Sequence, residues 1–145
     1  MCNDLMPEFI RNLEAMGMSS KDRVLVAVSG GPDSMALLHL FLRWDSTRVG
    51  VFHLNHGFRK EAGEDAQLVA DFCRQRGVPA HVVFYDVSSY LKKSGESKQQ
   101  GARRIRYKLL EQHAVEEDYQ RIALGHHGDD QAETVLMRLL RGSGL

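Results

Sequence analysis

The chain has few cysteines and no long apolar run, and each absence narrows what it can be. Its two cysteines, Cys2 and Cys73, are far apart and form no Cys-x-x-Cys pair, which argues against a disulfide framework, a zinc ribbon or an iron–sulfur site. No apolar stretch approaches the length of a membrane span, and the polar start of the chain does not resemble a signal peptide. We therefore expect a protein of the reducing cytoplasm with no membrane partner.

Neither sign of charge is in excess, because 19 Lys and Arg residues balance 19 Asp and Glu residues among 145. A nucleic-acid partner would have to be recognised by a local basic cluster rather than by overall charge. The length suits one domain, and 43% hydrophobic with 26% charged residues suits a packed core under an ordinary polar surface. We expect an N-terminal helix and linker over 1–22 and the main domain over 23–145.

Strands and helices are predicted to alternate along the chain. Nearly continuous apolar runs predict strands, and apolar residues at helical spacing predict helices. The predicted strands are 24–28, 49–54, 80–85 and 121–124, and the predicted helices are 7–16, about 34–44, 64–76, 101–116 and 129–140, with a mobile loop at 94–100. This alternation is typical of a doubly wound α/β fold with a parallel sheet, which binds ligands at the carboxyl ends of its strands.

The segment Ser29-Gly-Gly-Pro-Asp-Ser34 joins the first predicted strand directly to a helix. Its two glycines allow a sharp turn and close approach to a phosphate, and its two serines add hydroxyl donors. Free backbone N–H groups and the positive end of the helix dipole favour an anion there. The Asp33 carboxylate beside a polyphosphate is a natural Mg²⁺ ligand. The alternative is an ordinary glycine turn between a strand and a helix.

A second polar segment, His53-Leu-Asn-His-Gly-Phe-Arg59, follows the second predicted strand. We expect a backbone carbonyl to satisfy His53, because no cysteine or suitably spaced histidine supports a zinc site. Arg59 supplies a cation at the ligand end of the sheet. Phe58 is expected to anchor the core, and the alternative is that it stacks on a base.

The fourth predicted strand ends in Gly125-His-His-Gly-Asp-Asp-Gln-Ala-Glu-Thr134. In a helix, Asp130 and Glu133 project from one face because they are three residues apart. Two carboxylates at the ligand end of a sheet can hold an ammonium group or a metal. The alternatives are helix capping and a solvated helix face.

The basic element of the chain is Gln100-Gly-Ala-Arg-Arg-Ile-Arg-Tyr107. Arg103 and Arg106 share one helical face, and arginine beside tyrosine suits phosphate and single-stranded RNA. The alternative is a solvated helix face.

The Ser-Gly-Gly-x-Asp-Ser pattern resembles the PP-loop of the N-type ATP pyrophosphatases. With the other motifs in the same order, the chain resembles the N-terminal catalytic domain of the tRNA(Ile)-lysidine synthetase family. The family usually has Leu where Phe58 stands and a small residue other than glycine at Gly101. The matching segments are Ser29–Ser34, Leu54–Arg59, Ala102–Arg103, Arg106–Tyr107, Gly125–Thr134 and Arg138–Gly144.

The resemblance implies an ATP-dependent reaction at the wobble cytidine of tRNA(Ile) with a CAU anticodon. The cytidine is adenylated at C2 with release of pyrophosphate, and the amine of free L-lysine then displaces AMP to give lysidine. The implied catalytic residues are Asp33, which also holds Mg²⁺, Asp130 and Glu133, which receive the lysine ammonium groups, and Arg103. The implied ATP-binding residues are Ser29, Gly30, Gly31, Pro32, Asp33, Ser34, Asn55, His56, Arg59, Gly125 and His126.

The family continues beyond Gly144, so we expect this chain to be a fragment that is inactive alone, with tRNA held mainly by C-terminal domains. Apolar surface from Leu136, Leu139 or Leu140 would then be covered by self-association, giving a homodimer. Two alternatives remain. A tRNA 2-thiolation enzyme would use paired cysteines, and a non-catalytic ATP-binding module would not need Asp33 or the Asp130/Glu133 pair.

Overall fold

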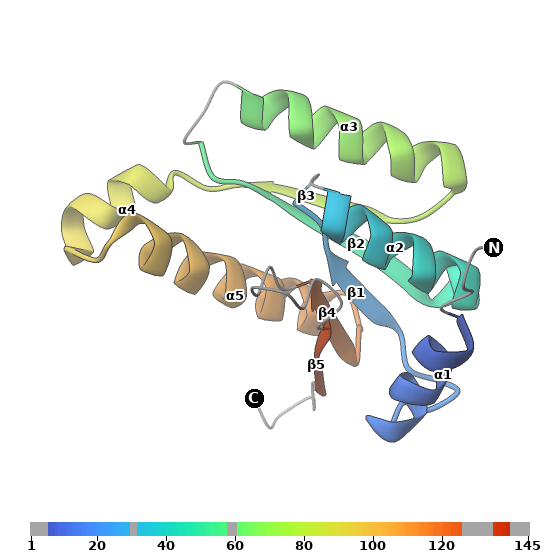
Figure 1. Cartoon of the computed structure of the whole chain (residues 1–145). Coiled ribbons are helices and arrows are strands. Elements are labelled where there is room, and N and C mark those ends of the chain that lie inside the picture. Colours follow the sequence, from blue (N-terminus) through green and yellow to red (C-terminus); the bar gives the residue numbers. More distant parts are fainter. Residues whose placement is uncertain (1–5, 30–31, 58–60, 126–134, 140–145) are drawn as a thin grey trace.

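A five-stranded sheet forms the centre of the molecule, in the order β3-β2-β1-β4-β5 (Figure 1). In this computed structural model, residues 6–29, 32–57, 61–125 and 135–139 are described, with backbone alone for 32–33, 61–63, 125 and 135–139. The first four strands are parallel, and the fifth runs antiparallel to the fourth. The strands are β1 (Val24–Ala27), β2 (Val49–Asn55), β3 (Ala80–Phe84), β4 (Arg121–Gly125) and β5 (Val135–Leu139).

Helices cover both faces of the sheet (Figure 1). Helices α1, α2 and α3 pack on one face, and α5 packs on the other, which confirms the predicted doubly wound α/β fold. Among the described residues, no helix combines the length and the apolar character needed to cross a membrane. The helices are α1 (Met6–Ala15), α2 (Pro32–Asp45), the 3₁₀ turn η1 (Ser46–Arg48), α3 (Glu61–Arg76), α4 (Val87–Ser94) and α5 (Lys98–Glu116).

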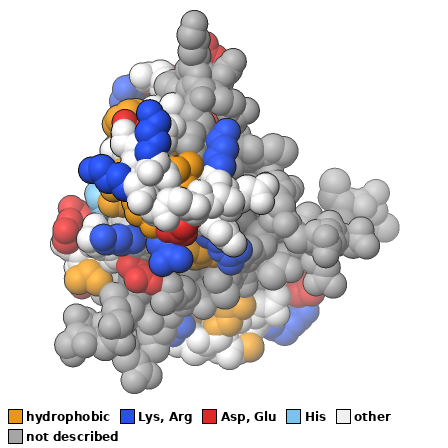
Figure 2. Space-filling model, turned by 90° about the vertical axis from the view of Figure 1, so that its left-hand side faces the viewer, with side chains coloured by type: hydrophobic (Ala, Val, Ile, Leu, Met, Phe, Trp, Pro, Cys, Tyr) orange, Lys and Arg blue, Asp and Glu red, His pale blue; other side chains and the backbone are white. Residues whose placement is uncertain are grey.

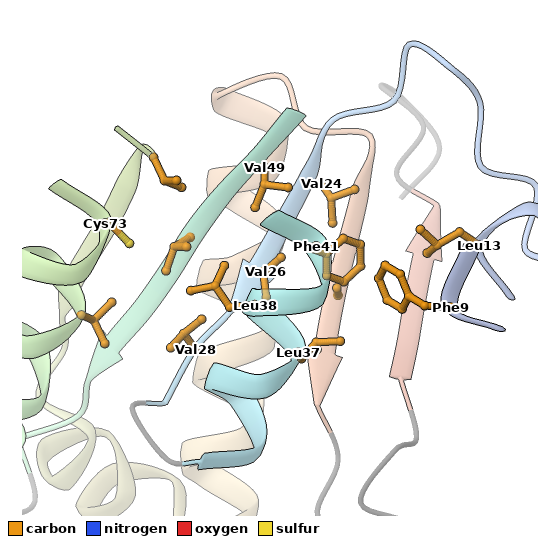
Figure 3. Packing of buried hydrophobic residues seen from close by; sticks show 14 of the residues in the cluster. Phe9, Leu13, Val24, Val26, Val28, Leu37, Leu38, Phe41, Val49 and Cys73 are labelled. Atoms are coloured by element: carbon orange, nitrogen blue, oxygen red, sulfur yellow. The ribbon is translucent and has the colours of Figure 1, made fainter. Parts of the chain in front are cut away.

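Strand β1 is buried on both faces, which explains its continuous apolar run. On one face Val24 and Val26 pack in a cluster that contains Phe41 of α2 (Figure 3). The Phe9 ring of α1 lies edge-on to the Phe41 ring, with 4.9 Å between the two ring centres. On the other face Leu25 packs in a second cluster with Leu110 of α5. The central strand is therefore fixed between two apolar layers.

Two sequence predictions need correction. The predicted helix over 129–140 is wrong at Val135–Leu139, which forms strand β5 along the open edge of β4; the rest of that range lies outside the described residues. A five-residue apolar run with a β-branched residue fits either structure, and pairing with β4 decides between them. The predicted loop at 94–100 is mostly helical, because α5 begins at Lys98, where the Ser97 side chain accepts a hydrogen bond from the Gln100 N–H.

Arg121, the first residue of β4, fastens the linker between α1 and β1. It is 5% exposed, its Nε lies 3.1 Å from Asp22 Oδ2, and it donates to the carbonyl oxygens of Met16 (3.1 Å) and Gly17. Burial raises the pKa of Asp22, but hydrogen bonds from Ser19 and Arg121 and the Arg121 charge outweigh it, so the pKa lies below its ordinary value. The carboxylate therefore stays ionised.

Two further arginines lie at the starts of strands and also donate to main-chain carbonyls. Arg48 precedes β2 and contacts the same linker, while Arg23 precedes β1 and contacts the turn after α5, with its guanidinium 4.3 Å from the centre of the Tyr119 ring. The acceptors are the carbonyl oxygens of Ser19, Asp22, Glu117 and Asp118. Arginines therefore fasten the amino edge of the sheet, where the four parallel strands begin.

Candidate functional site

The carboxyl ends of the four parallel strands lie on one edge of the sheet, and the predicted site segments follow them. Ala27 of β1 is in register with Phe52 of β2 and with Leu124 of β4. Strands β2 and β3 lie on one side of β1, and β4 lies on the other, so the direction in which strands are added to the sheet reverses between β1 and β4. In open α/β sheets, ligands bind at the carboxyl edge near this switch. The segment after β1 is therefore the first place to look for a ligand site.

The turn after β1 is closed by its two serines. The Ser29 backbone N–H donates to Ser34 Oγ at 3.1 Å, and the two hydroxyl oxygens lie 3.2 Å apart. Ser34 is 7% exposed, and α2 begins two residues earlier at Pro32, a residue suited to the first position of a helix. The chain thus turns directly from β1 into a 14-residue helix, whose N-terminus faces the carboxyl edge.

His53 holds the end of β1 in place. Its Nδ1 lies 2.7 Å from the carbonyl oxygen of Val28, and the side chain is 4% exposed. The prediction that a backbone carbonyl satisfies this histidine is confirmed. The contact fixes the residue just before Ser29, so β2 positions the entry to the turn.

The end of β2 forms a second tight turn. The Asn55 side-chain oxygen accepts from the Gly57 N–H at 3.1 Å, and the Asn55 carbonyl accepts from the Tyr85 N–H at 3.0 Å. Gly57 has a φ of +74°, a conformation that favours glycine. This Asx turn orients the chain at His56, which is half-buried. Asn55 and His56 therefore reach the same edge as the serine turn.

Helix α5 brings arginines toward this edge. It has 19 residues, about 28 Å, whereas the five-residue β4 spans about 17 Å, and α5 ends just before β4 begins. Its N-terminal half therefore extends past the carboxyl edge (Figure 1). Arg103 is exposed and its Nη2 lies 3.4 Å from the Tyr107 hydroxyl. Arg106 is half-buried, and its buried Nε has no hydrogen-bond partner among the described residues.

Several predicted site residues lie outside the described part of the chain, and their roles stay predictions: Gly30, Gly31, Phe58, Arg59, His126, Asp130 and Glu133. Pro32 and Asp33 start α2, and Gly125 ends β4. Within the described ranges, no group of three or more His, Cys, Asp or Glu side chains could hold a metal ion. The structure therefore brings together the serine turn, His53 and the Asn55 turn, and it does not test the Asp130/Glu133 pair.

One exposed aromatic at this edge was not predicted. Phe84, the last residue of β3, is 66% exposed, and its ring lies 3.4 Å from where a Cβ on Gly57 would be. Helix α4, which follows, was also missed, although Asp86 caps its start and Gly95 its end. Hydrogen bonds from Ser89 lower the pKa of Asp86, which keeps the cap ionised. Asp86 as a helix-capping residue, the two lysines of the last turn and the glycine that follows could have indicated this helix.

The family model of the PP-loop domain matches residues 5–145. The chain therefore belongs to the PP-loop domain family. It is 43% identical over 143 residues to the tRNA(Ile)-lysidine synthase of Chlorobaculum tepidum, covering 95% of this chain and 43% of that protein. It is 42% identical over 140 residues to the tRNA(Ile)-lysidine synthase of Bacillus thuringiensis, covering 94% and 29% respectively.

A similar match is the "bifunctional protein TilS/HprT" of Listeria monocytogenes, 42% identical over 129 residues, with 86% of this chain and 20% of that protein covered. The chain thus spans between 20% and 43% of the length of these three relatives. Two solved structures share the fold. One is the U34-tRNA thiolase NcsA of Methanococcus maripaludis, with a TM-score of 0.66 and 18% identity, covering 86% of this chain and 47% of that one. The other is the NH3-dependent NAD synthetase of Campylobacter jejuni, with a TM-score of 0.60 and 21% identity, covering 82% of this chain and 52% of that one.

Proposed function

We propose that this chain is the ATP-using domain of a tRNA(Ile)-lysidine synthase. The observation that supports this best is the closed turn, in which Ser34 Oγ accepts from the Ser29 N–H at the N-terminus of α2. The N-terminus of α2 lies directly after this turn, and its dipole favours an anion such as the pyrophosphate part of ATP. His53 contacts the carbonyl oxygen of Val28, so the end of β1 that leads into the turn is held in place.

In the proposed reaction, the oxygen at C2 of the wobble cytidine attacks the α-phosphorus of ATP and pyrophosphate leaves. The amine of lysine then attacks C2 and AMP leaves. The serine turn stabilises the departing pyrophosphate, and Asp33 at the start of α2 would hold Mg²⁺, which neutralises charge on the phosphates. Positioning three substrates at one edge supplies much of the rate.

The two arginines of α5 serve as phosphate contacts in this proposal. The buried Arg106 Nε with no partner among the described residues supports an anionic group beside it. Arg103 is exposed on the same helix and is proposed to contact ATP or tRNA phosphate. Asp130 and Glu133 are proposed to receive the ammonium groups of L-lysine.

The proposed setting is the cytoplasm, where tRNA(Ile) and free lysine are both available. The relatives named tRNA(Ile)-lysidine synthase support a tRNA substrate. A homodimer remains part of the proposal, and sedimentation of the purified protein tests it: a monomer at all concentrations contradicts it.

The serine turn is tested by Ser34→Ala, with Ser20→Ala in the exposed linker as a matched control. We expect Ser34→Ala to weaken ATP binding about tenfold, because the Ser29 N–H loses its acceptor and the turn loses its closed geometry. Ser20→Ala should bind ATP like the unmodified protein. Calorimetric titration with a non-hydrolysable ATP analogue measures the affinity.

Activity separates the proposed function from its alternatives. In a full-length protein that contains this chain, pyrophosphate release should require both tRNA(Ile) and ATP, and lysine should be incorporated into the tRNA. Pyrophosphate release with tRNA but without any lysine incorporation would favour another PP-loop tRNA-modifying enzyme. ATP binding without pyrophosphate release under any of these conditions would favour a non-catalytic ATP-binding module.

A further inference from the structure

Positive charge is concentrated in one segment of this electrically neutral chain. Between Val87 and Leu110 the sequence has seven basic residues and a single acidic one, Glu96, whereas the whole chain has 19 of each sign. The rest of the chain is therefore acidic in balance. The basic residues are Lys92, Lys93, Lys98, Arg103, Arg104, Arg106 and Lys108.

The segment folds as helix α4 and the N-terminal part of α5, which pack together and extend past the carboxyl edge of the sheet (Figure 1). Gly95, with a φ of +72°, ends α4 and turns the chain toward α5. At Gly101 an added Cβ would lie 2.1 Å from Leu91 Cδ2, so glycine at this position lets α4 lie close against α5.

All of the basic side chains of this segment except Arg106 are exposed. Lys92, Lys93 and Lys108 are exposed, and so are Arg103 and Arg104. In Figure 2, which looks onto this end of the molecule, Lys and Arg side chains predominate over Asp and Glu among the described residues.

The single acid of the segment is engaged within it. Glu96 accepts a hydrogen bond from the Tyr90 hydroxyl and lies 3.1 Å from Arg104 Nε. Its charge is therefore used on α5 and does not offset the lysines of α4. We call the exposed residues Lys92, Lys93, Lys98, Arg103, Arg104 and Lys108 the α4–α5 basic face.

We propose that the α4–α5 basic face binds the phosphate backbone of the RNA substrate and guides it to the candidate site. This rests on the proposed function, and it places an RNA contact within this chain rather than mainly in other domains. A group of exposed cations in which basic residues outnumber acidic ones attracts a polyanion, and it gives affinity without sequence preference. The Arg103 guanidinium, 5.3 Å from the centre of the Tyr107 ring, adds a flat surface where the face meets the carboxyl edge.

The test reverses the charge of two lysines that lie away from the candidate site. Lys92→Glu/Lys93→Glu changes two basic residues in the last turn of α4. Arg74→Glu/Arg76→Glu makes the same charge change in the last turn of α3, so total charge and helix-dipole effects are matched. The affinity for a tRNA(Ile) transcript is measured by fluorescence anisotropy at salt concentrations from about 50 to 200 mM.

We expect the α4 variant to bind tRNA at least about tenfold more weakly at the lowest salt and to lower the salt slope by roughly 1.5 to 2. The α3 variant should behave like the unmodified protein. ATP affinity should be unchanged in both, which also shows that both fold. If ATP binding falls in the α4 variant, Lys92→Gln/Lys93→Gln is measured instead, and a tRNA loss of about fivefold with normal ATP affinity is expected.

Equal tRNA affinity in the two charge-reversed proteins overturns the proposal. So does a tRNA affinity in the unmodified protein that does not change with salt. If the α4 variant loses tRNA binding while a full-length protein that contains this chain releases no pyrophosphate, the proposed function fails and the basic face stands. If pyrophosphate release is normal and the α4 variant binds tRNA normally, the proposal for the basic face fails and the proposed function stands.

Discussion

Arginine has opposite uses at the two edges of the sheet. At the amino edge, Arg121 is 5% exposed and is bound by the Asp22 carboxylate and by linker carbonyls. At the carboxyl end, Arg104 has a side chain that is 69% exposed and has one carboxylate partner, Glu96. The same side chain fastens the fold at one edge and is presented to solvent at the other, because main-chain carbonyls of the linker surround Arg121, whereas Arg104 has a carboxylate partner on an exposed helix.

The difference lies in what surrounds each guanidinium. A buried guanidinium must have its donors satisfied, and removing either member of a buried ion pair leaves an uncompensated charge. An exposed pair is solvated by water and contributes little to stability. Charge at the amino edge therefore serves stability, and charge at the carboxyl end is available for a ligand.

The strongest way to test this comparison is to remove one arginine from each edge. Arg121→Met should lower the free energy of unfolding by about 3–5 kcal/mol, since Asp22 is left without its cation and the linker without its donor. Arg104→Met, which removes an exposed pair, should cost less than about 1 kcal/mol. Urea unfolding followed by circular dichroism measures both. Similar losses in the two variants would contradict the comparison.

A smaller effect separates two glycines, one near each edge. A Cβ on Gly50 of β2 would lie 1.9 Å from the Tyr119 hydroxyl. The Tyr119 ring cannot easily move, because it is buried and the Arg23 guanidinium packs over it. Gly50→Ala should therefore destabilise the protein by about 1–3 kcal/mol.

Gly101→Ala is the matched change in α5. There the clash is with Leu91 Cδ2, the tip of a flexible side chain, and alanine gains about 1 kcal/mol of helix propensity over glycine. We expect a change within about 0.5 kcal/mol of zero, measured by thermal unfolding. A loss at Gly101 as large as that at Gly50 would show that the α4–α5 contact is as rigid as the sheet.

The smallest effect concerns pH at the amino edge. The pKa of Asp22 is lowered in the folded protein below its ordinary value of 3.8. Its contribution to stability is therefore complete above about pH 3.8 and is lost as pH falls through the lower folded value. Asp22→Asn should flatten the dependence of unfolding free energy on pH in this acid range, as measured by urea unfolding at a series of pH values. An unchanged acid dependence would remove Asp22 from this role.

Most of the sheet could be predicted from sequence because its strands are short apolar runs bounded by polar turns. The predicted strands at 24–28, 49–54, 80–85 and 121–124 differ from β1 to β4 by one residue at their ends. The helix predicted over 129–140 was wrong at β5, because β5 forms by pairing with β4, which a local helical pattern cannot reveal. Long-range hydrogen bonding overrode local periodicity there.

The site was predictable where its chemistry is local. His53 and its carbonyl acceptor followed from a strand-end histidine without metal partners, and the structure places Val28 as that acceptor. The exposed Phe84 could not be predicted, because its exposure depends on which face of β3 lacks cover. The same-face spacing of Asp130 and Glu133 assumes a helix around them and stays a prediction.

The strand order has a consequence for synthesis on the ribosome. Strand β1 pairs with β2 on one edge and with β4 on the other, and β4 is made much later than β2. Arg23, just before β1, donates its backbone N–H to the side chain of Gln120, which lies 97 positions further along the chain. At roughly 5–20 residues per second, this edge stays open for about 5–20 s in each nascent chain. An apolar strand with unpaired N–H and C=O groups is a template for wrong pairing during that interval. The pace of translation between α2 and β4 therefore sets how long each new molecule needs protection from its neighbours.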